Sequence, residues 1–167
     1  MLDNLIKDLI SREGGYVNNP DDPGGETNMG ISKRSYPHLD IKNLTYNQAN
    51  IIYKRDFYYK YRIDYLPELL QPQVLDFTVN SGNTCIRKLQ KLLGVKQDAV
   101  IGNITLTQLN KQYPNVKDQI NLNNLLVIER LMLFRDIIRR RNKSIKFRDG
   151  WQERTLDFAI TNWSGHI

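Results

Sequence analysis

Cysteine and histidine are scarce in this 167-residue chain, which has one cysteine, Cys85, and two histidines, His38 and His166. One cysteine cannot form an internal disulfide, and so few histidines argue against a zinc site and against a Ser/His or Cys/His catalytic triad. We therefore interpret Cys85 as a small buried hydrophobe, and we expect no metal and no cofactor.

Long apolar runs are also missing. The first ten residues include Asp3, Lys7 and Asp8, so they cannot form the apolar core of a signal peptide. No apolar run reaches the length of a membrane span. We expect a protein that is made in the cytoplasm without stable membrane insertion, and that needs another factor to release it if it acts outside.

The net charge of +6 is unevenly distributed. Residues 1–73 hold 9 Lys+Arg and 10 Asp+Glu, whereas residues 74–167 hold 15 and 8. The basic second half should favour a polyanion, which could be a nucleic acid, an anionic membrane surface or an acidic wall polymer. No known nucleic-acid motif is present, and the run Arg139–Arg141 is typical of a solvated helix end, so we do not expect a nucleic-acid partner.

Apolar residues recur at helical spacing through most of the chain, which predicts a mainly α-helical fold. Residues 16–31 are instead rich in Asn, Asp, Pro and Gly, and we expect a small β-hairpin or irregular lobe there. Thr45 and Gln48 have the spacing of a capping box. The longest expected helix, 122–141, is apolar over much of its circumference and is predicted to be the central core helix. The ranges predicted to be helical are 2–13, from 45 onward, 74–79, 86–93, 105–113, 122–141 and 150–163.

Glu13 is the first candidate catalytic residue. It follows Ile6, Leu9 and Ile10 at spacings of seven, four and three, so it shares their face at the last turn of the first helix. A carboxylic acid in partly apolar surroundings can hold its proton near neutral pH and act as a general acid. Gly14 and Gly15 follow and have no side chains, so a polymer could approach the backbone closely.

Asp22 lies nine residues after Glu13, in a turn that contains Pro23 and Gly24. This turn can fold back over the helix end, and two carboxyl groups that flank the scissile bond are what glycoside hydrolysis requires. Aspartate next to Pro-Gly is also ordinary turn chemistry, so the residues leave both roles open for Asp22 and favour the turn role for Asp21. Thr27 could help to hold a water molecule by a hydrogen bond.

A long motif runs through this region, from Glu13-Gly14-Gly15-Tyr16 to Asn19–Ile31. It resembles the signature of glycoside hydrolase family 108, which comprises N-acetylmuramidases of the lysozyme-like superfamily, many of them bacteriophage endolysins. Further segments resemble the predicted peptidoglycan-binding region that follows in this family: 74–77, 80–82, 89–90, 93–95 and 100–102. The chain departs from the family at Asp98-Ala99, where Asp-Gly is common, and this weakens any ligand role for that turn.

The resemblance implies a lysozyme-like helical body, with a catalytic region at 1–73 and a helical, peptidoglycan-binding-like region at 74–167 packed into one body. It also implies the substrate, the β-1,4 bond between N-acetylmuramic acid and N-acetylglucosamine, and it makes Glu13 the catalytic acid. The spacing of Glu13, Asp22 and Thr27 is similar to the Glu/Asp/Thr trio of phage T4-type lysozymes, although Thr27 lies one residue closer. The residues expected to bind substrate are Gly14, Gly15, Tyr16, Gly25 and Asn28.

Three activities therefore remain as hypotheses. The first is a monomeric endolysin that hydrolyses peptidoglycan after holin-type release from the host cytoplasm. The second is a lytic transglycosylase, which needs no attacking water. The third is a non-catalytic wall-binding module. The basic half could in addition contact anionic polymers of the cell envelope.

Overall fold

The computed structural model describes residues 2–18 and 25–161, without the side chains of residues 142 and 143. These residues fall into two compact units, Met1–Lys60 and Tyr61–Ile167. Each unit is described by itself below. The described residues are mainly helical, with one small antiparallel sheet, which confirms the predicted fold class.

The first unit begins with helix α1 (Leu2–Glu13), as predicted, and its buried residues are Ile6, Leu9 and Ile10. Strands β1 (Thr27–Asn28) and β2 (Ile31–Ser32) form the expected hairpin, and a bridge between Val17 and Thr27 extends it. Helix α2 (Tyr46–Tyr53) has the predicted capping box at its N-terminus and continues into the π-helix η1 (Lys54–Tyr59). Helix α1 packs against α2.

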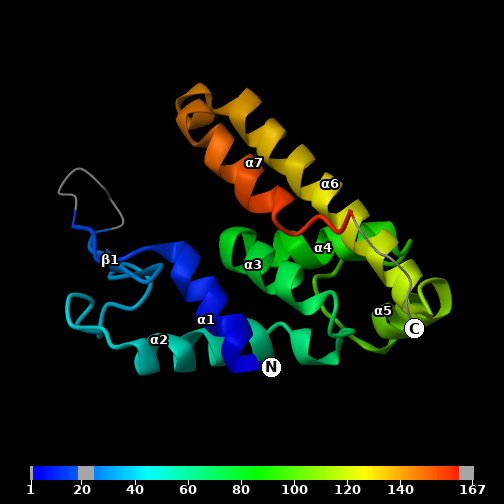
Figure 1. Ribbon diagram of the computed structural model, residues 1–167, viewed down its shortest axis with the longest axis horizontal. Helices are drawn as coiled ribbons and strands as arrows, with labels where there is room; N and C mark the ends of the chain where they lie inside the picture. Colours follow the sequence, from blue (N-terminus) through cyan, green and yellow to red (C-terminus); the bar gives the residue numbers. More distant parts are fainter. Residues whose placement is uncertain (1, 19–24, 162–167) are drawn as a thin grey trace. The chain divides into compact units, whose positions relative to one another are not determined.

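The second unit contains five α-helices among its described residues, and the long helix α6 runs beside α7 (Figure 1). Helix α6 also packs on α4, and α3 packs on α4. No helix in the described part of the chain is both long and apolar enough to span a membrane. The elements are η2 (Ile63–Tyr65), α3 (Gln71–Ser81), α4 (Asn83–Leu92), α5 (Asn103–Gln112), α6 (Val116–Arg140), η3 (Asn142–Phe147) and α7 (Arg148–Leu156).

Helix α6 is the longest described helix, as predicted, but it begins six residues earlier and only part of its apolar surface enters the core. Ile128 and Met132 were expected in the core, yet they are 50% and 42% exposed. The buried face instead carries Leu122 and Leu126 together with the charged Arg130. The prediction of the core face was wrong because a charged residue occupies a central core position.

Arg130 is fully buried because Asp76 accepts a hydrogen bond from it at 2.6 Å. Asp76, on α3, also accepts hydrogen bonds from Arg154 on α7, the shortest at 2.7 Å. One carboxylate therefore joins three helices of the second unit.

Helix α7 is shorter than the range 150–163 that the sequence predicted, because it ends at Leu156. The Asn123 side chain donates to the Phe158 carbonyl at 2.7 Å. Asn124 donates to the Ile160 carbonyl and accepts from the Ile160 amide, both at 3.0 Å. These amides of α6 satisfy backbone groups that a longer helix would have used, so the chain continues in an extended form.

Cys85 is fully buried in α4, which confirms its interpretation as a small hydrophobe. Its thiol donates to the Val74 carbonyl at 3.6 Å. Burial raises the pKa of Cys85 to about 12, so the thiolate that a nucleophile needs is not formed near neutral pH.

Candidate active site

Glu13 is the last residue of α1, and its side chain is half-buried. The helix ends there because Gly14 has a φ of +80°, in the left-handed region where a glycine typically terminates a helix. The preceding buried residues Leu9 and Ile10 set the direction of this face. The structure therefore places the carboxylate at the end of an apolar face, as the spacing predicted.

The turn of the hairpin packs directly against Glu13. A methyl group on Gly30 would lie 2.7 Å from Glu13 Oε2 and 2.5 Å from the hydroxyl oxygen of Tyr53, which leaves no room for any side chain at this position. The φ of Gly30 is +75°. The carboxylate of Glu13 and the Tyr53 hydroxyl thus both lie beside the backbone of Gly30.

Tyr53 holds this turn in place. Its ring is 1% exposed, at the end of α2, and its hydroxyl donates to the carbonyl of Met29 at 2.8 Å. A buried tyrosine hydroxyl needs a hydrogen-bond partner, and here that partner is the residue before Gly30. Tyr53 and Gly30 are therefore positioning residues for Glu13.

We predict that Gly30→Ala lowers the rate of wall cleavage by roughly 100-fold, because a shift of about 1 Å in a catalytic group has an effect of that size. The added methyl group must displace Glu13, Tyr53 or the turn itself. Release of reducing ends from purified peptidoglycan measures the rate, and thermal unfolding measures stability.

Gly94→Ala is the matched control. Gly94 has a similar φ, +68°, but an added methyl group there would meet nothing within 4 Å. Both substitutions should lose about 1–2 kcal/mol of stability from the left-handed backbone. Equal cleavage rates for the two variants would show that Gly30 does not position the carboxylate.

Thr27 is half-buried in β1, and its amide and carbonyl pair with those of Val17 at 2.8 Å. This pairing joins the chain shortly after Glu13 to the hairpin. Asp22 and Asp21 lie outside the described residues, so the proposed partner carboxylate has no structural account here.

Tyr16 is partly exposed, and its hydroxyl donates to the Glu26 carboxylate at 3.0 Å. Desolvation, followed by this hydrogen bond, raises the pKa of the Tyr16 hydroxyl, so it remains a donor near neutral pH. Asn28 instead uses its side-chain amide to anchor the hairpin, because it donates to the Ile41 carbonyl at 3.0 Å. Gly15 and Gly25 are exposed beside these residues.

Tyr53 and Gly30 were missed as site residues by the sequence reasoning. Tyr53 was counted only as part of an apolar helical face, and Gly30 only as part of the family motif. One signal was available for Tyr53, since a tyrosine on a buried face must bring its hydroxyl to a polar partner. The partner itself lies 24 residues away in the chain, which periodicity does not reveal.

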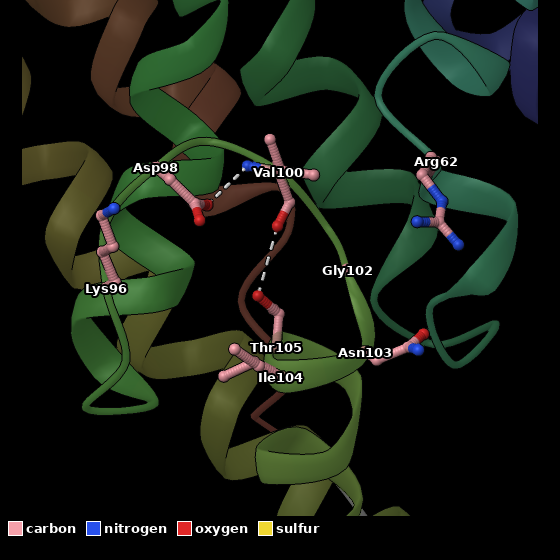
Figure 2. Close-up of a pocket in the computed structure, with 8 residues that line it drawn as sticks. All are labelled: Arg62, Lys96, Asp98, Val100, Gly102, Asn103, Ile104 and Thr105. Carbon is pink, nitrogen blue, oxygen red and sulfur yellow. Dashed lines mark hydrogen bonds between the residues drawn. The ribbon is translucent and has the colours of Figure 1, made fainter.

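The second unit contains a separate open cavity of about 440 Å³. Figure 2 shows Arg62 on one side of it, Lys96 and Asp98 on the other, and Asn103 at the start of α5. Asp98 serves the loop itself, since it accepts from Gln90 at 2.7 Å and from the Val100 amide at 3.0 Å. The cavity therefore offers two cationic side chains to a ligand.

Ala99, where the family often has glycine, keeps the left-handed backbone with a φ of +66°. Its amide donates to the side-chain oxygen of Gln90 at 2.8 Å, which holds the turn in this conformation. The departure from the family motif therefore leaves the shape of the turn suited to glycine.

A half-buried glutamate at a helix end, covered by a short hairpin in a mainly helical chain, defines the class as a lysozyme-like glycoside hydrolase. The family model described as glycosyl hydrolase 108 matches residues 6–82. The chain is also similar to a solved structure from Brucella abortus, SagA, with 31% sequence identity and a TM-score of 0.71. That similarity covers 96% of this chain and 97% of SagA.

The chain belongs to the glycosyl hydrolase 108 family. It is a glycoside hydrolase of the peptidoglycan-degrading kind. No curated protein matches the sequence. The family match crosses the division between the two compact units, because it runs from α1 through α3 to Gly82. The functional division predicted at residues 73 and 74 stays a prediction.

Proposed function

We propose that the protein is an N-acetylmuramidase, which hydrolyses the β-1,4 bond between N-acetylmuramic acid and N-acetylglucosamine in peptidoglycan. The observation that carries this proposal is Glu13, half-buried at the end of α1 and packed against Gly30 in a chain of this family. Among the described residues, no cluster of His, Cys, Asp and Glu side chains is suited to a metal ion. We assign the chemistry to carboxylates.

In the proposed mechanism, Glu13 donates its proton to the glycosidic oxygen as the bond from that oxygen to the sugar carbon breaks. Asp22 takes a proton from a water molecule, which attacks the same carbon from the opposite face, and Thr27 holds that water. Such a reaction inverts the anomeric configuration and needs the two carboxyl groups about 6.5–9.5 Å apart. The remaining lining is proposed to bind sugar through Gly14, Gly15, Tyr16, Gly25 and Asn28.

Mass spectrometry of the products from purified peptidoglycan, digested in heavy-oxygen water, tests this reaction. We predict muramic acid reducing ends that each carry one heavy oxygen, because water supplies the new hydroxyl group. Products that are lighter by one water molecule and unlabelled would instead establish a lytic transglycosylase. Digestion mixtures without any cleaved glycan would leave only wall binding.

The endolysin role belongs to the same proposal and is supported by the resemblance to phage muramidases. In this role the protein is made in the host cytoplasm, acts as a monomer and reaches the wall after holin-type release. Lysis of host cells that produce the chain, dependent on a co-produced holin, is the expected result. Lysis without any holin would contradict this route.

Wall binding by the second unit is a further candidate function, favoured by its cavity. Arg62 and Lys96 present positive charge there, and Arg62 stacks over the Tyr65 ring at 4.3 Å. Peptide stems of peptidoglycan carry carboxylates that such a cavity could hold. Sedimentation of a cleavage-deficient protein with purified peptidoglycan measures this binding apart from catalysis.

A further inference from the structure

The connection between α6 and α7 concentrates positive charge. Six of the ten residues 139–148 are lysine or arginine, and none is acidic. Arg139, Arg140 and Arg141 are exposed at the end of α6, and Lys146 and Arg148 are exposed beyond them. We call residues 139–148 the hairpin tip; it lies at the end of α6 that is farther from α5 (Figure 1).

Acidic neighbours neutralise only part of this charge. Arg148 pairs with Asp149 at 2.8 Å, and Arg135, one turn before the tip, pairs with Asp136 at 3.2 Å. Both pairs are exposed, so they are weak in water. Arg139, Arg140 and Arg141 have no carboxylate partner among the described residues.

Two large apolar side chains are exposed among these cations. Ile145 is 52% exposed and Phe147 is 48% exposed. The Phe147 ring stacks on Trp151 at 5.7 Å, and Trp151 stacks on Phe134 at 4.8 Å. This stack joins the tip to the core of the second unit, so the exposed face of Phe147 is held in place.

A small cavity beside the tip repeats this combination. It has a volume of about 150 Å³, and Leu131, Phe134 and Ile138 supply its apolar part. Arg139 and Arg148 of the tip line the same cavity. Apolar surface next to arginine occurs here for the second time within one turn of α6.

We propose that the hairpin tip binds the surface of an anionic lipid bilayer. Cations next to exposed apolar side chains match a bilayer interface, where anionic headgroups lie above acyl chains. A purely polyanionic partner would explain the arginines but not Ile145, Phe147 and the apolar cavity. A second copy of the tip would meet like charge. This contact is independent of the cleavage reaction and would keep the enzyme at the membrane that borders the wall.

Co-sedimentation of the full chain with vesicles tests the proposal. We expect binding to vesicles of phosphatidylethanolamine and phosphatidylglycerol at 3:1 and none to pure phosphatidylcholine. Replacing Arg139, Arg140 and Arg141 by glutamine should weaken binding at least tenfold. Ile145→Ser should weaken it about threefold or more, and the loss should remain at 0.5 M salt, where charge contacts are screened.

Matched controls use equally exposed residues elsewhere. Ile51, on α2, is 58% exposed, so Ile51→Ser removes a similar apolar side chain. Replacing Lys7, Lys111 and Lys117 by glutamine removes three exposed cations away from the tip. Both controls should bind vesicles within twofold of the unaltered chain. Equal losses in the controls, or equal binding to phosphatidylcholine, would overturn the proposal.

Two further readings keep the result interpretable. Tip variants should cleave purified peptidoglycan, which holds no lipid, at the unaltered rate, and this shows that they fold. Vesicle binding that persists in Ile145→Ser and disappears entirely in salt would point to a plain polyanion site and contradict a bilayer contact. Failure of cleavage in every protein would affect the proposed function and not this one.

Discussion

Glu13→Gln is expected to lower the rate of peptidoglycan cleavage by about 10²- to 10⁴-fold, the usual contribution of a general acid. Glutamine keeps the shape of the side chain beside Gly30 and Tyr53 but has no proton to donate to the leaving oxygen. Release of reducing ends from purified peptidoglycan measures the rate. The melting temperature should stay within a few degrees, because the packing against the hairpin turn is retained.

Asp8→Asn supplies the matched control, because it removes a carboxylate from the exposed side of the same helix. Its cleavage rate should equal that of the unaltered protein. Glu13→Gln should also still sediment with peptidoglycan, which separates lost chemistry from lost binding. Near-normal cleavage by Glu13→Gln would sink the assignment of the general acid.

The same assay bears on Asp22. If Asp22 is the general base, Asp22→Asn should lose activity on a scale similar to Glu13→Gln. Unchanged turnover would reduce Asp22 to turn chemistry and leave a mechanism with one carboxylate.

The position of Glu13 could be predicted from sequence because it depends on local rules. Helical spacing from Ile6 to Ile10 sets the face, and Gly14 ends the helix. The cover over Glu13 could not be predicted in the same way. It joins Gly30 and Tyr53, which come from two other elements of the first unit, and only the folded chain brings them together.

The core of the second unit shows the same limit. Periodicity identified α6 as the longest helix but chose Ile128 and Met132 for the core, where the structure buries Arg130. An arginine is rarely buried without a partner. Its partner, Asp76, lies 54 residues earlier, so the local pattern gave no reason to place Arg130 inside.

Asp76→Asn should produce the largest loss of stability, about 3–5 kcal/mol, because removing one partner of a buried pair leaves uncompensated charge. Asp76 is 2% exposed and bonds to both Arg130 and Arg154. Without its negative charge, two arginines would face each other inside the second unit. Urea unfolding followed by circular dichroism measures the change in the free energy of unfolding.

Arg135→Gln controls for the loss of an ion pair as such. Its pair with Asp136 is about half-exposed on both sides, and such pairs contribute about 0–1 kcal/mol. The free energy of unfolding should therefore hardly change. A loss for Asp76→Asn no larger than this control would contradict the role of the buried cluster.

The geometry also orders two substitutions within the cluster. Arg130→Met should be less damaging than Asp76→Asn, at roughly 1–3 kcal/mol, because Arg154 still balances Asp76. Arg130 Nε and Nη1 make no hydrogen bond within the described part of the chain, and the ring of Phe77 lies 5.2 Å from the guanidinium carbon. Methionine removes these unsatisfied groups and fits among apolar neighbours. The reverse order would mean that Arg130, and not Asp76, is the residue on which the three helices depend.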